Sequence, residues 1–247
     1  MHKADKAIIM AAGLGNRMRP ITEQIPKPLI AVQGKRMIDT VVDALHANGI
    51  TQIYVVVGYL KHVFEEWVLQ YEDITLIENP YYQTCNNISS LYVAREHLGN
   101  CIILDGDQMI YNPEVLNPTF EASGYCSVWT EEATDEWLQT VADGKVISCS
   151  RSGGTNGWQL YSVSFWTKQD GQRLKDLLEE EFERKQHTDI YWDDIAMFCY
   201  PEQFELTVRP IEKADIVEID DYQELLGIDK TYKEREKGRG YESSEYK

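Results

Sequence analysis

The sequence contains the stretch Lys6-Ala-Ile-Ile-Met-Ala-Ala-Gly-Leu-Gly-Asn-Arg-Met-Arg-Pro20, in which a short apolar run leads into a glycine-rich, basic loop, and Pro26-Lys27-Pro28 follows in the same loop. The apolar run is typical of a strand that is buried on both faces of a parallel sheet. Such sheets bind ligands at the carboxyl ends of their strands, where this loop begins. The stretch therefore predicts an α/β fold with a binding site in the loop.

The loop has the residue types that bind phosphate groups. Gly13 and Gly15 let backbone N–H groups approach phosphate oxygens, and Arg17 and Lys27 supply positive charge. The loop is not a P-loop, because the Gly-Lys-Ser/Thr ending is missing, and it is a poor dinucleotide fingerprint, because the third glycine is absent. This pattern favours a nucleoside triphosphate as the ligand.

The same loop resembles the signature of the nucleotidyltransferases that couple a nucleoside triphosphate to a phosphorylated sugar or alcohol. Later segments are similar to the bacterial phosphocholine cytidylyltransferases: Asn86-Asn-Ile-Ser-Ser-Leu91, Thr134-Asp-Glu-Trp137, Val163-Ser-Phe-Trp166 and Asp189-Ile-Tyr-Trp-Asp193. The similarity runs from about residue 6 to about residue 226. It implies that CMP passes from CTP to phosphocholine by direct in-line displacement, giving CDP-choline and pyrophosphate with the help of Mg²⁺.

The resemblance also implies roles for individual residues. The residues expected to be catalytic are Lys27, Arg17, Asp107 and Asp193. The two aspartates are also expected to hold Mg²⁺, because this ion binds through one or two carboxylates together with phosphate oxygens. The residues expected to contact the nucleotide are Ala11, Ala12, Gly13, Leu14, Gly15, Asn16, Arg17, Lys27, Asn87, Ser89 and Asp105. Two parts of this set have a structural interpretation as well. Asp105 fits a turn or cap, and Asn86, Asn87, Ser89 and Ser90 fit the start of a helix.

An aromatic cage is expected for the acceptor, because a quaternary ammonium group donates no hydrogen bonds and binds aromatic faces. The candidates are Trp137, Trp166, Tyr191 and Trp192. Core packing would equally explain Trp166 and Tyr191, and Trp67 and Trp129 are expected in the core. Asp194 departs from the resembled family, which often carries an amide there, and its role stays open.

Three alternatives remain at this point. The acceptor could be 2-aminoethylphosphonate, whose primary ammonium prefers carboxylates and carbonyls, and the additional acid Asp194 keeps this open. A sugar-1-phosphate nucleotidyltransferase is less favoured, because a tryptophan-rich acceptor region suits a cation better than a polyol. A non-catalytic nucleotide-binding module is disfavoured by the intact Arg17, Lys27, Asp107 and Asp193.

Composition excludes several other classes. A net charge of −17 repels nucleic acid, yet residues 1–36 hold seven Lys or Arg against two acids, so positive charge gathers around the glycine loop. No apolar stretch reaches the ~20 residues of a membrane span. The five cysteines form no C-x-x-C pair, and charged residues lead straight into the first strand without a secretory apolar segment. We expect a cytoplasmic protein without membrane or nucleic-acid partners; its oligomeric state stays open.

The order of the elements predicts a single doubly wound, mostly parallel mixed sheet of the Rossmann-like nucleotidyltransferase type, with an inserted hairpin in the acceptor region. Strands are expected near 6–11, 52–57, 74–78, 101–105, 158–166, 206–211 and 216–219, and helices over 38–45 and near 61–70, 87–98, 168–186, 191–200 and 220–226. A hairpin is expected over 137–149, turning at Asp143-Gly144. Residues 1–228 form the nucleotidyltransferase domain in this prediction, and 229–247 form a polar C-terminal tail.

Overall fold

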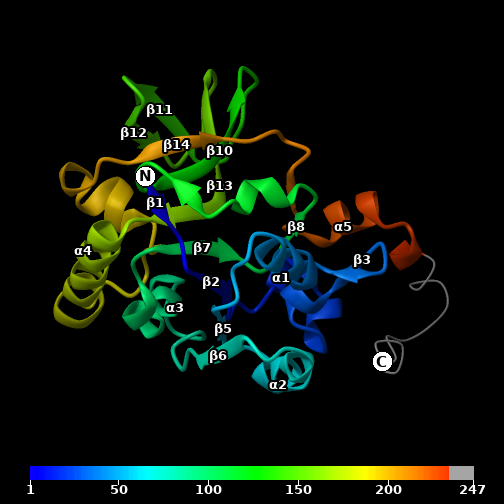
Figure 1. Ribbon diagram of the computed structural model, residues 1–247. Coiled ribbons are helices and arrows are strands. Elements are labelled where there is room, and N and C mark those ends of the chain that lie inside the picture. Colours follow the sequence, from blue (N-terminus) through cyan, green and yellow to red (C-terminus); the bar gives the residue numbers. More distant parts are fainter. Residues whose placement is uncertain (234–247) are drawn as a thin grey trace.

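The computed structural model describes residues 1–233 and is built around a sheet of nine strands (Figure 1). Its parallel core has the order β7-β2-β5-β6, formed by β7 (Cys101–Asp105), β2 (Lys6–Ala11), β5 (Ile53–Val57) and β6 (Ile74–Glu78). The expected α/β fold with a parallel core is thereby confirmed. The glycine loop leaves the carboxyl end of β2, at the centre of this core.

Helices cover both faces of the parallel core. Successive side chains of a strand point to opposite faces, so Ile9 packs with one group of buried side chains while Ile8 and Met10 pack with another. The first face is covered by α1 (Met37–Ala47) and α2 (Lys61–Trp67). The second is covered by α3 (Ile88–Val93) and α4 (Lys168–Glu179). This double covering explains the continuous apolar runs of the parallel strands.

An antiparallel extension projects from the β7 edge of the sheet (Figure 1). β13 (Gly157–Trp166) pairs with β7 and also with β10 (Gly124–Thr130) and β11 (Leu138–Ala142). The hairpin of β11 and β12 (Lys145–Ser150) turns at Asp143 and Gly144, both with positive φ, as expected for a two-residue hairpin turn. β14 (Thr207–Pro210) completes the sheet beside β10.

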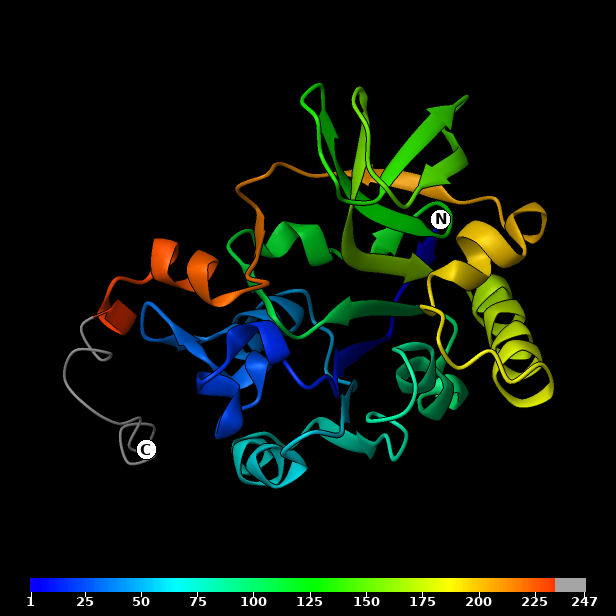
Figure 2. The same ribbon diagram turned by 180° about the vertical axis from the view of Figure 1, so that it is seen from behind.

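The C-terminal part of the described chain packs on the N-terminal loop. Figure 2 shows α5 (Tyr222–Ile228) beside the blue N-terminal segment, and Ile219 and Leu225 share a buried cluster with Met18 and Ile21. The short two-stranded pairs are β1 (His2–Lys3) with β9 (Thr119–Phe120), β3 (Ala31–Val32) with β4 (Lys35–Arg36), and β8 (Gln108–Ile110) with β15 (Ile216–Glu218). This packing brings the residues after β15 close to the glycine loop.

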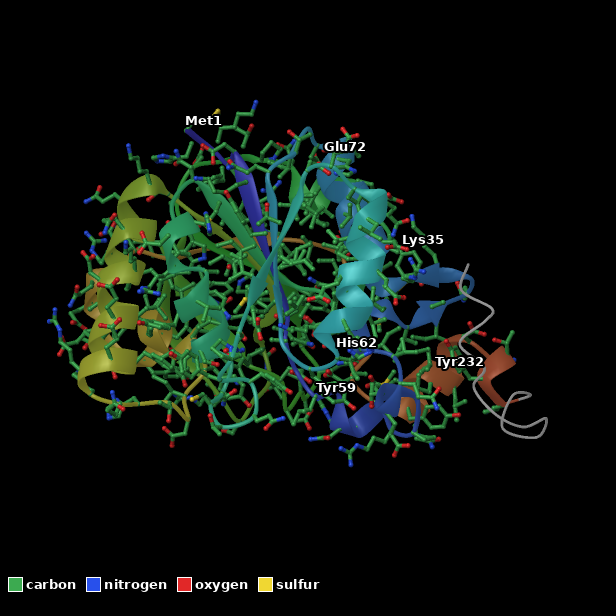
Figure 3. All side chains as sticks on the ribbon, turned by 90° about the horizontal axis from the view of Figure 1, so that it is seen from below. Met1, Lys35, Tyr59, His62, Glu72 and Tyr232 are labelled. Carbon is green, nitrogen blue, oxygen red and sulfur yellow. The ribbon has the colours of Figure 1, made fainter. Side chains whose placement is uncertain are left out.

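The structure corrects the expected boundary of the polar tail at residue 229. Tyr232 is buried and donates a hydrogen bond to the carbonyl of Ala31 at 2.6 Å, and Figure 3 shows it beside the hairpin that carries Lys35. Asp229 is also buried and accepts a hydrogen bond from the Gln33 amide at 2.7 Å. The first five residues of the expected tail therefore belong to the folded domain. The rest of it, 234–247, lies outside the described residues.

Several predicted elements differ from the observed ones. The helix expected near 87–98 is only α3 followed by a short 3₁₀ turn, and the helix expected to 186 continues from α4 as a π-helical turn over 180–184. The helix expected over 191–200 is a turn followed by a π-helical segment, Ile195–Cys199. Strand β10 was not anticipated. Trp129 was wrongly expected in the core: it is 48% exposed and packs edge-on against Trp158.

No helix within residues 1–233 combines the length and apolar content needed to cross a bilayer.

Glu181, in the π-helical turn after α4, is the buried member of a polar cluster that includes Tyr200. Its side chain is 2% exposed and contacts Lys185 and the Tyr200 hydroxyl at 2.7 Å and the His187 ring at 2.6 Å. Burial raises the pKa of Glu181, but hydrogen bonds from these three groups outweigh it, so the net pKa lies below its ordinary value. The ionised carboxylate is therefore the form that stabilises the fold.

We expect Glu181→Gln to lower the free energy of unfolding by about 2 kcal/mol at pH 7, because the charge-assisted hydrogen bonds are lost. A depressed folded-state pKa stabilises the fold above the unfolded pKa, and this contribution disappears as the pH falls through the folded value. The difference between variant and wild type in urea denaturation should therefore shrink below about pH 4.5. Glu180→Gln, which removes only a helical i,i+4 pair with Arg184, should cost less than about 0.5 kcal/mol. Equal costs for the two variants would contradict this account of the cluster.

Candidate active site

A cavity of about 460 Å³ lies over the carboxyl ends of β2 and β7. All the residues expected to contact a nucleotide line it: Ala11, Ala12, Gly13, Leu14, Gly15, Asn16, Arg17, Lys27, Asn87, Ser89 and Asp105. Asp107 and Asp220 line it as well. The structure thus brings together segments that are nearly two hundred residues apart in sequence, although their contact with nucleotide stays a prediction.

Gly15 shapes the loop that closes one side of this cavity. Its φ of +60° lies in the left-handed region, and a Cβ atom there would meet the Thr22 Cγ2 at 2.8 Å. The Thr22 hydroxyl donates to the Gly15 carbonyl at 2.8 Å and holds the turn. Only glycine meets both conditions at this position. The loop is therefore preformed where Gly13, Leu14 and Gly15 line the cavity.

Lys27 stands at the centre of a charge network on the cavity floor. Its Nζ atom lies 2.6 Å from the Asp107 carboxylate and 3.1 Å from that of Asp220. Asp220 also pairs with Arg17 at 3.0 Å. Burial alone would lower the pKa of Lys27, but the two carboxylates outweigh it and hold the pKa above its ordinary value. Lys27 is thus a fixed cation in a largely buried position.

A second cavity of about 220 Å³ adjoins the first, and the two share Asn87, Asp105, Asp107 and Asp220. Its lining is rich in acids, which are Asp105, Asp107, Glu136, Asp193, Glu218 and Asp220, and it also contains Trp137 and Tyr191. Burial raises the pKa of Asp193 and of Glu218 to about 7, with like-charged neighbours adding to the effect. For Asp105, burial and then Asp107 raise the pKa well above its ordinary value. Such crowding of acids favours a cationic ligand.

The four aromatic candidates for an acceptor cage separate into two pairs. Trp137 and Tyr191 both line the second cavity, with ring centroids 5.8 Å apart and nearly perpendicular planes. Trp166 is fully buried and Trp192 is 5% exposed, and each packs against the other and against Tyr125. Trp166 and Trp192 do not line the second cavity, because core side chains surround their rings. Sequence alone does not show which aromatic rings face a cavity.

Asn87 and Ser89 differ in what they can offer a ligand. Asn87 lines both cavities, makes no side-chain cap on α3, and accepts a hydrogen bond from the Trp192 amide at 3.0 Å. The Ser89 hydroxyl is fully buried, donates to the Asn86 carbonyl at 2.8 Å and accepts from Asn79 at 3.0 Å. The Ser89 hydroxyl is therefore already hydrogen-bonded within the cavity wall, whereas Asn87 lines both cavities.

Asp220, Glu218 and Glu136 are site residues that the sequence analysis missed. Glu218 ends β15 and accepts a hydrogen bond from the Ser162 amide at 3.2 Å, and Asp220 follows before α5. The run Glu218-Ile219-Asp220-Asp221 is an acidic cluster after a strand, the same type of signal that pointed to Asp107. Glu136 directly precedes Trp137 in the segment Thr134-Asp-Glu-Trp137.

The structure brings Asp107 and Asp193, the expected metal ligands, into the lining of one cavity and adds Asp220 to them. Asp107 and Asp220 both contact one Lys27 nitrogen, so their oxygens already meet at a single cationic point. Asp193 lies in the same acidic cavity, but it has no such shared contact and burial favours its protonated form. Among residues 1–233, no group of three or more acidic, histidine or cysteine side chains is already arranged as a complete metal site. Magnesium needs no such group when phosphate oxygens supply the remaining ligands.

Comparison with known proteins agrees with this geometry. A family model described as a MobA-like NTP transferase domain matches residues 7–184, which include the glycine loop, Lys27 and Asp107. The chain belongs to this nucleotidyltransferase family. Membership makes it a nucleotidyltransferase enzyme and accounts for a triphosphate-sized cavity beside the glycine loop.

Two relatives that this nucleotidyltransferase matches over most of its length are cytidylyltransferases whose names give an amine-bearing acceptor. It is 36% identical to a 2-aminoethylphosphonate cytidylyltransferase of Lancefieldella rimae over 229 residues, 92% of each chain. It is 32% identical to the choline-phosphate cytidylyltransferase of Streptococcus pneumoniae over 228 residues, 92% of this chain and 98% of the relative. The solved structure of the CTP:phosphocholine cytidylyltransferase from Streptococcus pneumoniae superposes with a TM-score of 0.85 and covers the same shares of the two chains.

Proposed function

We propose that this enzyme transfers CMP from CTP to phosphocholine, forming CDP-choline and releasing pyrophosphate. The observation that carries the proposal is the pairing of two cavities: one beside a preformed glycine loop with Lys27, and one lined by acids and by Trp137 with Tyr191. A phosphorylated quaternary ammonium compound needs this combination, because its cation prefers aromatic faces and carboxylates while its phosphate must face the nucleotide. The uncharged sugar ring of a sugar phosphate gives no reason for so acidic a cavity.

The residues of the first cavity supply what direct displacement requires. Lys27 exchanges its carboxylate partners for oxygens of the α-phosphate, and Arg17 with the amides of Gly13 to Gly15 holds the β- and γ-phosphates. The acceptor phosphate lies between the cavities, so that its oxygen attacks the α-phosphorus in line with the departing pyrophosphate. No side chain forms a covalent intermediate. Catalysis therefore consists of positioning and of neutralising charge on the phosphates.

Asp107 and Asp220 are the residues proposed to hold Mg²⁺, which would neutralise the phosphates and align the acceptor phosphate when bound. This proposal replaces Asp193 with Asp220, since Asp220 shares the Lys27 contact with Asp107. Asp193 then acts as part of the acidic wall. When the nucleotide binds, its phosphates compete with the Asp107 and Asp220 carboxylates for the ammonium group of Lys27. Lys27 therefore exchanges carboxylate contacts for phosphate contacts in this proposal.

Pyrophosphate release tests the function directly. The four common nucleoside triphosphates are combined with phosphocholine, 2-aminoethylphosphonate and glucose-1-phosphate, in the presence of Mg²⁺. We expect release only with CTP and most rapidly with phosphocholine, and mass spectrometry should identify CDP-choline. Release that is fastest with glucose-1-phosphate, or with a nucleotide other than CTP, would refute the proposal.

One specific observation favours 2-aminoethylphosphonate as a second candidate acceptor. Glu136 and Glu218 line the same cavity as Trp137, and a primary ammonium group can donate hydrogen bonds to carboxylates. Asp194, the residue that kept this candidate open, does not contribute, because it pairs with Arg151 outside the cavity lining. The acceptor comparison in the same assay separates the two candidates.

Replacing Trp137 by alanine should raise the KM for phosphocholine about tenfold and leave the KM for CTP within about twofold, because one aromatic face toward the cation is lost. Trp129→Ala is the matched control, since this exposed tryptophan packs on Trp158 and lines neither cavity. Steady-state kinetics with each substrate varied in turn would measure both constants. A comparable increase for Trp129→Ala would show that general loss of packing explains the effect.

We also infer that the enzyme acts in the cytoplasm. All five cysteines are free thiols, and the pairs needed for a disulfide framework are absent.

A further inference from the structure

Two residues behind the second cavity hold its aromatic pair in place. We propose that the ion pair of Arg151 and Asp194 is a positioning device that sets the separation of Trp137 and Tyr191 and thereby controls acceptor binding. Neither residue lines either cavity. The inference rests on the proposed function, since it concerns the acceptor end of the same site, and it assigns a role to the acid whose purpose the sequence left open.

Asp194 closes the turn that presents Tyr191. Its side chain is 4% exposed and accepts a hydrogen bond from the Tyr191 amide at 2.9 Å, and its own amide donates to the Tyr191 carbonyl at 3.1 Å. Both hydrogen bonds join Tyr191 to Asp194, so they hold the two ends of the turn together. Asp193 lies within this turn. A shift of Asp194 would therefore move an aromatic wall and an acidic wall of the cavity together.

Arg151 connects this turn to the other aromatic wall. Its Nε and one terminal nitrogen lie 3.1 Å and 2.6 Å from the same oxygen of Asp194. The guanidinium group stacks on the Phe198 ring at 3.6 Å and lies 5.8 Å from the ring of Trp137. Trp137 in turn packs edge-on against both Tyr191 and Phe198, at 5.8 Å and 5.2 Å. One guanidinium thus joins the hairpin loop after β12, the tryptophan before β11 and the turn that carries Tyr191.

Charge makes the two partners depend on each other. Asp194 is buried, and a buried carboxylate without a partner is costly, so loss of Arg151 should displace its side chain. Loss of the Asp194 charge would leave Arg151, which is half exposed, free to turn toward solvent and away from Phe198. Either change loosens the same aromatic pair. The effects of removing the two partners should therefore overlap and not add.

Kinetics of single and double variants test this positioning role. Arg151→Met keeps most of the side-chain length, Asp194→Asn keeps an acceptor for the Tyr191 amide, and the double variant combines them. Glu205→Gln is the matched control, because it breaks an exposed ion pair, 2.9 Å long, between Glu205 and Lys145 of the same hairpin.

Each single variant should raise the KM for the preferred acceptor about tenfold while changing the KM for CTP less than about twofold. The KM of the double variant for the acceptor should be no higher than that of the more impaired single variant. Arg151→Lys should raise this KM less than Arg151→Met does, and Glu205→Gln should leave it at the wild-type value. Additive effects, or a parallel rise in the KM for CTP, would overturn the proposal, since both indicate a general structural defect.

Hydrogen–deuterium exchange provides a readout that does not depend on which acceptor is used. Backbone amides of residues 134–140 and 188–194 should exchange faster in Arg151→Met and in Asp194→Asn than in the wild type or Glu205→Gln. Unchanged exchange in both segments would refute the positioning role. If the wild type releases no pyrophosphate with any acceptor, the proposed function fails, and the exchange measurement still decides whether the ion pair orders the two segments.

Discussion

Replacing Lys27 by alanine should lower kcat about 10³-fold while weakening CTP binding, measured without acceptor, by less than about tenfold. Lys27 lines the first cavity and is held between Asp107 and Asp220, which line both cavities, so the proposed mechanism places its charge where the α-phosphate and the attacking oxygen meet. An interaction that strengthens as charge develops in the transition state affects kcat more than ground-state binding. Single-turnover kinetics and calorimetric titration with CTP would separate the two quantities.

Lys35→Ala is the matched control for this variant. Lys35 belongs to the same basic N-terminal region but pairs with Asp43 and lines neither cavity. Its replacement should change kcat and CTP affinity by less than about twofold, which is the usual size of an exposed ion-pair effect. Equal losses of kcat and CTP affinity in Lys27→Ala would show that Lys27 acts only in ground-state binding, and the proposed mechanism would then need another group at the α-phosphate.

Asp107→Asn should lower kcat/KM about 10³-fold at every Mg²⁺ concentration, because a carboxylate ligand is lost and the metal would be held by Asp220 alone. The same substitution has an opposite effect without metal. Removing this carboxylate takes away both a competitor for Lys27 and a repulsive charge, so CTP should bind more tightly to the variant than to the wild type in the presence of EDTA. Activity assays with varied Mg²⁺ and CTP titrations with and without EDTA would measure both effects.

Asp143→Asn serves as the control for the loss of one carboxylate. Asp143 occupies the exposed turn of the β11–β12 hairpin with a φ of +50°, which asparagine tolerates as well as aspartate. This variant should keep wild-type activity and CTP affinity. Weaker binding of CTP to Asp107→Asn in the presence of EDTA would contradict the competition between carboxylate and phosphate for Lys27.

The nucleotide side of the site could be predicted from the sequence because its signals are local. Gly13, Gly15 and Arg17 follow a strand whose apolar character identifies it as central, and Lys27 stands in the same loop. The topology of a parallel sheet then places Asp105 and Asp107 at the neighbouring strand end. Each of these inferences needs only the residue types and the rule that ligands bind at the carboxyl ends of parallel strands.

The acceptor side was harder to predict, because it depends on which face each side chain presents. Trp137 and Trp192 both lie in segments that resemble the same family. Trp137 nevertheless lines the second cavity, whereas Trp192 packs in the core. The segment that was expected to be helical over 191–200 begins instead with a turn closed by Asp194, and this turn decides the direction of Tyr191. Periodicity of apolar residues does not distinguish such a turn from the start of a helix.

Asp220 illustrates a third kind of limit. It meets Asp107 at Lys27 only because α5 and the residues before it pack against the N-terminal loop through Ile219 and Leu225. A strand pairing that the sequence analysis did not identify, β15 with β8, brings the two segments together. Strand β10 was missed as well, and its first four residues are buried without the alternation of a half-buried strand.

Binding of Mn²⁺ together with CTP tests most directly whether two distant carboxylates share one ion beside the glycine loop. Equilibrium dialysis with electron paramagnetic resonance detection would compare the wild type with Asp107→Asn, Asp220→Asn and Asp193→Asn. We predict that the wild type and Asp193→Asn bind the Mn²⁺–CTP complex with similar affinity, and that Asp107→Asn and Asp220→Asn bind it at least about tenfold more weakly. Wild-type affinity in Asp220→Asn, with the loss appearing in Asp193→Asn instead, would contradict the arrangement of Lys27, Asp107 and Asp220 on which the account is built.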